Sequence, residues 1–490
     1  MFSSKDGVLP DDVLYLILEQ ACVIQAEPPP SLWAYPSLFH GSSLFSASTA
    51  RKLSGVCGRW RSLLLSNPTV WSDVRITIRR PENLLWLDAC LARSASSPIK
   101  CIIQIDRPMG SCTREGDLTV TEVISRNPSN IRSLAINPRA SEEYDVLASD
   151  MGNLERLQVN AGTYGRATFP LTSHLAKLGT LILNRLHTLP HDVFFNIADL
   201  TLSNIISPVA NLVDILQTNQ ALETIRINNT VVIADPRGCS VSLPHLKLLC
   251  ISQSSPVPIL DIVLPLPAPS RVIIHDNTDS LIAPGILNLF HPFLMFGPND
   301  SVHTALVSFQ PKEALIIYHT FAGATIEIII QSNSPGHLPE FTPLLRALTL
   351  WGPFPDLRSL HLHIETAATG PITTSLIQII LSGVPRVTRL TFEGKSLSLY
   401  IFLALSVSAG VCPELEYLGG TLYPEDPITD CLRLLSEAAG GRPTIREVAL
   451  EALLLREEAE GILADIGPFI EQMKSCGMYK FSFTPLAERN

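Results

Sequence analysis

Apolar residues recur at three- and four-residue steps in two short stretches near the start of the chain. In the first stretch the recurring positions are Val13, Leu14, Ile17, Leu18 and Ala21. This spacing predicts an amphipathic helix with one apolar stripe. Pro10 is expected at its first position, and Asp11 and Asp12 place negative charge at the positive end of the helix dipole.

The second stretch predicts another amphipathic helix, which runs from Leu53 to Leu64. Its apolar stripe consists of Leu53, Val56, Cys57, Trp60, Leu63 and Leu64. Arg59, Arg61 and Ser62 fall on the opposite face, so something must cover the apolar one. Pro68 prevents the helix from continuing through its own position, and Trp71 is expected to fold back onto the apolar face.

A longer pattern begins near residue 130, where a phrase of the form apolar-x-x-apolar-x-apolar keeps returning. Its copies begin at Ile131, Leu154, Leu178, Leu222, Leu246, Leu357, Val387 and Ile445. The alternation that ends each copy predicts a strand with one buried face. Copies at residues 131, 154 and 178 are 23 and 24 residues apart, which suits leucine-rich repeats.

The segments between the copies complete the expected repeats. Helical stretches at 208–219, 374–382 and 430–439 would form a second layer outside the strands. Residues 253–343 are less regular, with further strands expected at 271–274 and 324–330. A helix over Glu451–Met473 is expected to cap the array. The alternative is an α/β domain with a conventional parallel sheet, which would need fewer, longer strands and no fixed period.

Composition narrows the class of protein. The chain has 490 residues, of which 46% are apolar, and this content excludes a mainly disordered chain. The formal net charge is −10, and Lys and Arg are dispersed apart from short clusters at 51–61 and 75–80. Nucleic acid is therefore not expected as a partner, because phosphate binding needs a concentrated basic surface. The clusters are interpreted as solvated helix faces.

Several sequence features bear on location. The N-terminus has no long apolar segment of a secretory signal, and polar residues and prolines interrupt the apolar tracts Leu281–Phe296 and Ala314–Ile330. The chain has ten cysteines and no C-x-x-C pair. This pattern is typical of reduced thiols. We therefore expect a cytoplasmic or nuclear protein without a membrane contact.

No catalytic motif is present. G-x-S-x-G, G-x-x-x-x-G-K-[ST], G-x-G-x-x-G, H-E-x-x-H and an EF-hand loop are all missing from the sequence. His361 and His363 would point the same way on a strand, but a zinc site needs further ligands. The sequence thus predicts no enzyme, no cofactor and no metal.

The two N-terminal stretches together resemble the F-box. The matching positions are Leu9, Pro10, Asp12, Val13, Leu14, Ile17 and Leu18, then Leu53, Val56, Cys57, Arg59, Trp60, Leu64, Pro68, Trp71 and Val74. Residues 23–50, with three consecutive prolines and a Ser-rich run, lengthen the gap between the halves and are interpreted as a flexible insertion. The alternative is a two-helix piece of an ordinary core.

The resemblance implies a small helical module that docks on the adaptor of cullin-RING (SCF-type) ubiquitin ligases. We assign adaptor binding to Leu9, Pro10, Val13, Ile17, Leu53 and Val56, and the core of the module to Leu14, Cys57, Trp60, Leu64 and Trp71. Trp60 is expected to pack inside against Val13, Ile17 and Leu64. In the competing interpretation Trp60 faces the adaptor as an anchor.

The expected fold class is α/β: a small all-α F-box domain followed by a leucine-rich-repeat-like α/β solenoid. The expected parts are the F-box at 1–80, a linker and first irregular repeat at 81–130, the solenoid at 131–450 and a cap at 451–490. A protein target would contact outward residues of the strands: Arg156, Gln158, Arg226, Asn228, His361, His363, Arg389, Thr391, Glu447 and Glu451. The expected function is the substrate receptor of the ligase, and the alternative is an F-box scaffold without a ligase role.

Overall fold

The computed structural model describes most of the chain in segments. These are residues 9–23, 47–94, 97–105, 119–138, 145–147, 149–161, 175–186, 196–233, 240–254, 256–263, 270–276, 302–310, 313–320, 323–331, 356–364, 374–408, 410–423, 426–441, 444–452, 467–475, 478 and 480–485. The chain forms two compact units, Met1–Leu222 and Glu223–Asn490. In these segments no helix combines the length and apolarity that a membrane crossing requires.

The first unit begins with three helices, α1 (Asp11–Val23), α2 (Ala47–Ser54) and α3 (Gly58–Leu65). Helix α1 packs against both others. The Pro10 carbonyl accepts the Leu14 amide at 2.9 Å, so Pro10 caps α1 and Asp11 is its first residue. The helix predicted at Leu9–Leu18 is therefore present, but it starts one residue after Pro10.

The single helix predicted from Leu53 to Leu64 is wrong, because the chain breaks between α2 and α3. Cys57 is extended, with φ −156°, and its sulfur accepts the Trp60 amide at 3.5 Å as an N-cap. Gly55 and Gly58 flank this break and weaken a continuous helix. Helix α2 instead extends backward, so residues 47–50 of the predicted insertion are helical, while residues 24–46 lie outside the described part.

The first unit continues as a parallel sheet. Its strands are β1 (Asp73–Ile78), β2 (Ile99–Ile105), β3 (Ile131–Asn137), β4 (Arg156–Asn160), β5 (Thr180–Asn184) and β6 (Asp199–Ser203). Each pairs in parallel with the next along the chain. The sheet thus begins inside the range 1–80 that the sequence assigned to the F-box, and β2 lies in the range assigned to the linker.

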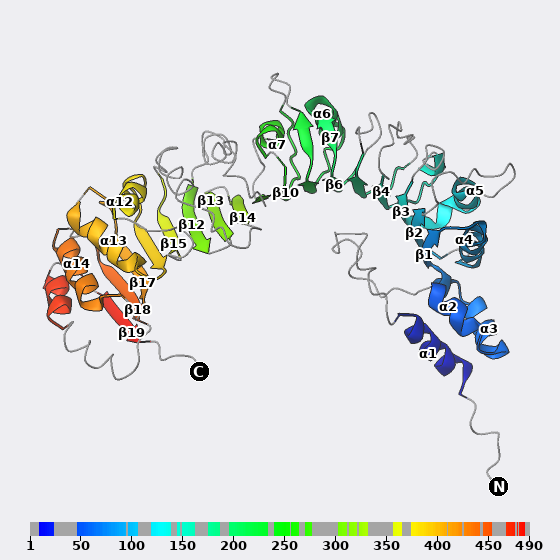
Figure 1. Cartoon of the computed structure of the whole chain (residues 1–490), viewed down its shortest axis with the longest axis horizontal. Coiled ribbons are helices and arrows are strands. Elements are labelled where there is room, and N and C mark those ends of the chain that lie inside the picture. The colour runs from blue at the N-terminus through cyan, green and yellow to red at the C-terminus, as the bar shows by residue number, and fades with distance from the viewer. Residues whose placement is uncertain are drawn as a thin grey trace, which may run out of the picture. The chain divides into compact units, whose positions relative to one another are not determined.

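Helices and turns fill the connections of this unit. They are η2 (Pro68–Trp71), α4 (Pro81–Ser94), α5 (Val120–Ser125), η3 (Pro128–Asn130) and α6 (Val209–Thr218), and a short strand, β7 (Ile206–Pro208), precedes α6. Helices α4 and α5 lie on the same side of β1–β3 (Figure 1). Leu154, Leu157 and Val159 of one phrase copy are fully buried, as its spacing predicts.

The second unit contains a sheet of both parallel and antiparallel strands. They are β8 (Thr224–Asn228), β10 (Leu248–Ser252), β11 (Arg271–Asp276), β12 (Val302–Gln310), β13 (Glu313–Thr320), β14 (Thr325–Gln331), β15 (Ser359–Ile364), β16 (Arg389–Glu393), β17 (Tyr417–Leu422), β18 (Glu447–Ala452) and β19 (Lys480–Pro485). A short strand β9 (Val231–Ile233) and helix α7 (Pro256–Val263) accompany them.

The pairing order in this sheet is β8-β10-β11-β14-β13-β12-β15-β16-β17-β18-β19. Strands β12, β13 and β14 form an antiparallel meander. Only residues 311–312 and 321–324 connect them, and a parallel crossover needs a dozen residues or more. The irregular middle of the sequence is therefore a meander flanked by parallel strands. The strands expected at 271–274 and 324–330 are confirmed.

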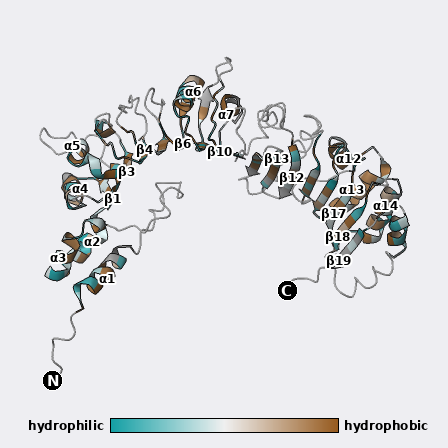
Figure 2. Ribbon diagram, turned by 180° about the vertical axis from the view of Figure 1, so that it is seen from behind, coloured by the Kyte–Doolittle hydropathy of each residue, from teal (hydrophilic) through white to brown (hydrophobic). Residues whose placement is uncertain are grey.

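Three helices, α12 (Thr374–Ser382), α13 (Leu397–Val407) and α14 (Ile428–Gly440), cover one face of the C-terminal strands (Figure 1). Helix α13 is apolar around most of its circumference because α12 and α14 flank it and the sheet lies beneath it (Figure 2). The rings of Phe392 on β16 and Phe402 on α13 meet edge to face at 5.5 Å.

The predicted C-terminal cap needs correction. The segment 451–490 contributes a further parallel strand, β19, which pairs with β18. Its helix covers residues 467–475, whereas residues 453–466 lie outside the described part. The mixed α/β architecture with a long sheet is confirmed, and every copy of the repeated phrase coincides with a strand.

Candidate binding surfaces

Helix α1 presents an apolar surface to solvent. Leu9, Val13, Leu16 and Ile17 are exposed by 48, 38, 61 and 48%. Val13, Leu16 and Ile17, three and one residues apart, lie on one side of α1, and Leu9 precedes the helix four residues before Val13; we call these four residues the α1 apolar face. Most large apolar residues of the described segments are buried, so this cluster is unusual. Leu16 was not among the predicted adaptor-binding residues.

Three hydrogen bonds hold the start of α1 against α3 and the loop that follows α3. The Arg59 Nε donates to the Asp11 carboxylate at 2.7 Å, and the same guanidinium donates to the Leu9 carbonyl. The Asn67 amide donates to the Tyr15 hydroxyl. The sequence placed Asp11 only against the helix dipole, so its pairing with Arg59, 48 residues away, was missed.

The other predicted adaptor-binding residues lie just before α1 or at and after the end of α2. Pro10 is exposed before α1, Leu53 is half-buried at the end of α2, and Val56 is 60% exposed between α2 and α3. Helices α2 and α3 both contact α1. The structure therefore leaves most of the predicted docking residues accessible.

The predicted core of the helical module is only partly buried. Leu14, Leu64 and Trp71 are buried, and the Trp71 Nε1 donates to the Leu64 carbonyl at 2.8 Å. Trp71 thus folds back as predicted. Cys57 is exposed because it caps α3, so its assignment to the core is wrong. Trp60 is half-buried, and full enclosure against Val13 and Ile17 does not occur.

In the first unit, Arg156 and Gln158 lie half-buried on the open face of β4, in register with Thr180 and Ile182 of β5. Asparagines at the ends of β4 and β5 and directly after β6 form hydrogen bonds with one another. The Asn184 amide donates to Asn160 at 2.9 Å, and the Asn204 amide donates to Asn184 at 2.8 Å. Sequence reasoning missed this series.

In the second unit, Arg226 and Asn228 lie on β8 and the other six predicted target-binding residues lie on β15, β16 and β18. They alternate with buried residues, so they share the face of the sheet opposite the helices. The register aligns His361, Thr391, Gly419 and Ala449 across neighbouring strands. The structure therefore brings the residues of β15, β16 and β18 together.

A hollow of about 320 Å³ lies in this face, and we call it the β17 hollow. Its floor contains Gly419 and Gly420 of β17 and Ala449 of β18, while His361, Glu393 and Glu451 stand around it. Small residues leave the space because large neighbours on both sides extend farther from the sheet. No local sequence pattern marks these small residues, so the hollow was not predicted.

Charged and aromatic groups around the β17 hollow are mutually paired. Burial lowers the pKa of His361, and its Nδ1 lies 2.6 Å from the Thr391 hydroxyl. The Arg389 guanidinium stacks over the Tyr417 ring at 3.9 Å. Lys480 pairs with Glu447. The hollow therefore offers a neutral imidazole, and the paired charges of Arg389, Glu447 and Lys480 lie beside it on strands that line it.

The meander and β11 carry five apolar side chains around Glu327 on the same face, and Glu327 pairs with Arg271. The register places Ile273, Glu327, Ile317 and Leu306 side by side on β11, β14, β13 and β12, with Ile329 and Leu315 beside them. All six are half-buried. Such a patch was missed because the repeated phrase is degraded there.

No group of three or more His, Cys, Asp or Glu side chains in the described segments could hold a metal ion. His361 and His363 share a face of β15, and their rings contact Thr391 and Glu393 respectively.

No protein-family model matches the chain, and no curated protein matches it. Among solved structures, one titled "Crystal structure of TLR13-ssRNA13 complex" aligns with a TM-score of 0.33 and 11% identity, over 76% of this chain and 48% of that chain. The chain thus spans about half the length of that protein. The functional assignment depends on the surfaces described above.

Proposed function

We propose that the chain is the substrate-recognition subunit of an SCF-type cullin-RING ubiquitin ligase of the cytoplasm or nucleus. In this proposal residues 1–80 contain the F-box and the sheet faces of a leucine-rich-repeat-like array bind a target protein. The resemblance of the two N-terminal stretches to the F-box motivates the proposal. The α1 apolar face is the single structural observation that carries it.

An exposed helical surface of this kind favours docking in a groove of another protein. Val13, Leu16 and Ile17 on α1 have the i, i+3, i+4 spacing that helix-in-groove recognition uses, and Leu9 extends the apolar surface before the helix. The Arg59 contacts to Asp11 and Leu9 fix the start of the helix before binding, which lowers the entropy that docking would cost.

The test is co-purification of the adaptor with the tagged full-length chain. Leu9→Ala combined with Pro10→Ala is expected to lower adaptor recovery at least about tenfold, because apolar anchors contribute about 1.4 kcal/mol or more at interface centres. Val407→Ala, a change at an apolar residue of α13 that is 68% exposed, is the matched control and should leave recovery unchanged. Wild-type recovery by the double variant would remove the F-box assignment.

The second candidate function is a scaffold that binds the adaptor without delivering a substrate. The two candidates differ in what accompanies the adaptor. Recovery of a cullin together with a target that accumulates under proteasome inhibition supports the ligase subunit. Recovery of the adaptor without a cullin supports the scaffold.

A further inference from the structure

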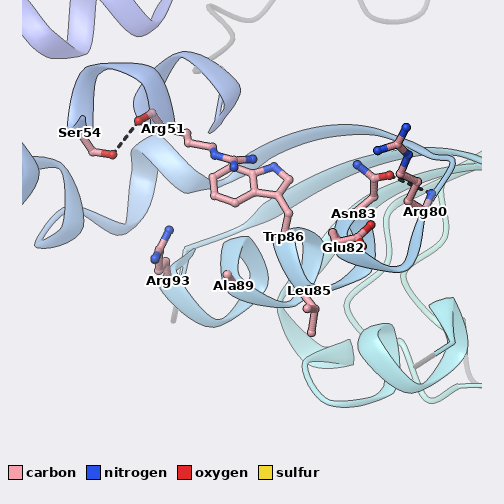
Figure 3. A pocket seen from close by; sticks show the side chains of 9 residues that line it. All are labelled: Arg51, Ser54, Arg80, Glu82, Asn83, Leu85, Trp86, Ala89 and Arg93. Carbon is pink, nitrogen blue, oxygen red and sulfur yellow. Dashed lines mark hydrogen bonds between the residues drawn. The ribbon is translucent and has the colours of Figure 1, made fainter. Parts of the chain in front are cut away.

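A groove of about 660 Å³ lies between α2 and α4 in the first unit, and no residue of α1 lines it (Figure 3). Arginines dominate its lining: Arg51 comes from α2, Arg80 precedes α4, and Arg93 lies in the last turn of α4. Glu82 is the one acidic side chain among the residues that line it. We call it the arginine groove.

Aromatic rings hold two of these arginines in place. The Arg51 guanidinium lies over the Trp86 ring at 4.8 Å, and the Arg93 guanidinium lies over the Trp71 ring at 4.7 Å. The two rings meet edge to face at 5.8 Å. Stacking restricts the guanidinium groups but leaves their in-plane N–H donors available to a ligand.

The protein itself supplies little negative charge to these donors. Among the residues that the structure describes, none of the three arginines pairs with a carboxylate. Burial raises the pKa of the nearby Cys90 thiol to about 12, although Arg93 and Arg51 act in the opposite direction. Cys90 is therefore protonated and uncharged at neutral pH.

The spacing of the arginines favours an elongated ligand. Arg80 and Arg93 are 13 positions apart (93 − 80). A helix of that length spans about 20 Å at 1.5 Å per residue. An extended peptide covers about 20 Å with roughly six residues, whereas a single phosphate group reaches only one end.

We propose that the arginine groove binds a short acidic segment of a partner protein in extended form. Its anionic side chains, carboxylates or phosphates, would contact Arg51, Arg80 and Arg93, and an apolar side chain would contact Leu85, which is 62% exposed. None of the residues that line this groove is among those proposed to bind the adaptor or the target. Nucleic acid is disfavoured because Arg51 covers a face of the Trp86 ring, which is then not free to stack on a base.

The test is fluorescence anisotropy with the full-length chain. Three labelled peptides of equal length carry one leucine and, at alternate positions, glutamate, phosphoserine or glutamine. The two anionic peptides are expected to bind at least about tenfold more tightly than the glutamine peptide. Similar affinity of all three peptides would overturn the proposal, and comparison of the two anionic peptides identifies the preferred anion.

Variants assign the binding to the groove. Arg51→Glu and Arg80→Glu are each expected to weaken the anionic peptides about tenfold, or about 1.4 kcal/mol. Lys52→Glu makes the same charge change at the next residue of α2, outside the groove, and should leave affinity unchanged. Arg51→Lys, which keeps the charge, should retain part of the affinity if the fold is intact.

Two further outcomes would overturn the proposal. One is an equal loss in Lys52→Glu and Arg51→Glu, which would indicate only a general charge effect. The other is tighter binding of a labelled oligodeoxythymidine than of either anionic peptide. Adaptor recovery is measured on the same variants and should not change, so failure of this proposal is distinguishable from failure of the F-box assignment.

Discussion

Two adjacent glycines on β17 have different roles, because neighbouring residues of a strand point to opposite faces. A Cβ at Gly420 would overlap the ring of Phe392, which is buried between the sheet and α13. A Cβ at Gly419 would instead lie 2.8 Å from the Tyr417 hydroxyl, at the far end of a side chain that can move. Gly420 therefore serves packing, and Gly419 leaves room in the β17 hollow.

Alanine at each position tests this difference. Gly420→Ala is expected to destabilise the second unit by about 1–3 kcal/mol, because overpacking forces the Phe392 ring from its place. Gly419→Ala should cost less, since Tyr417 can move, while the added methyl narrows the hollow. Urea unfolding of both variants is the measurement. Equal destabilisation would contradict the assignment of the two glycines to opposite faces.

At the scale of elements, Asp426 links the start of α13 to the turn before α14. Its carboxylate is buried and accepts the Ser396 amide at 2.8 Å, the Ser398 hydroxyl at 2.9 Å and the Tyr423 amide at 2.9 Å. Ser396 has φ 58°, a conformation that most residues avoid. The carboxylate thus fixes a strained turn that the sequence alone did not predict.

Removing this carboxylate should loosen both helices. Asp426→Ala leaves three buried or half-buried donors without their acceptor, and we expect a loss of roughly 3 kcal/mol or more in the free energy of unfolding. Asp430→Ala is the matched control on α14, because Asp430 is exposed and its pair with Arg433 contributes at most about 1 kcal/mol. Thermal unfolding compares them, and a Tm for Asp426→Ala equal to that of the control would refute the linking role.

The sequence predicted elements well wherever a local pattern was strong. The phrase at Leu357 and the apolar spacing of Thr374–Ser382 both correspond to observed elements, because burial of one face follows directly from period 2 or 3.6. The β17 strand was missed since its two glycines hide the apolar alternation. The arginine groove was also missed, because it joins Arg51 and Trp86 from separate helices, and no local pattern records that contact.

At the scale of the second unit, the predicted target-binding residues lie on one sheet but not at one place. Arg226 on β8 and Arg389 on β16 are separated by β10, β11, β14, β13, β12 and β15. Neighbouring strands lie about 4.8 Å apart, so the seven steps from β8 to β16 separate the two strands by about 34 Å across the sheet. The meander inserted between them, with its apolar patch, accounts for much of that separation.

A target that contacts both arginines must therefore be a folded domain or a long segment, and the two contacts should act independently. Charge reversal at Arg226 and Arg389 together is expected to weaken capture of a target by at least about tenfold, through altered electrostatic complementarity, while adaptor recovery stays unchanged. Each single variant should account for part of the loss. Quantitative recovery of the target with the tagged chain is the measurement.

Arg389 requires its own control because its guanidinium also stacks over Tyr417. Tyr417→Leu removes the stacking and keeps the charge, so it separates loss of the charge from movement of the side chain. If Tyr417→Leu captures the target normally and Arg389→Glu does not, the charge itself contacts the target. Normal capture by the Arg226 and Arg389 double variant would instead place the target elsewhere, because both charges stand on the open face of the same sheet.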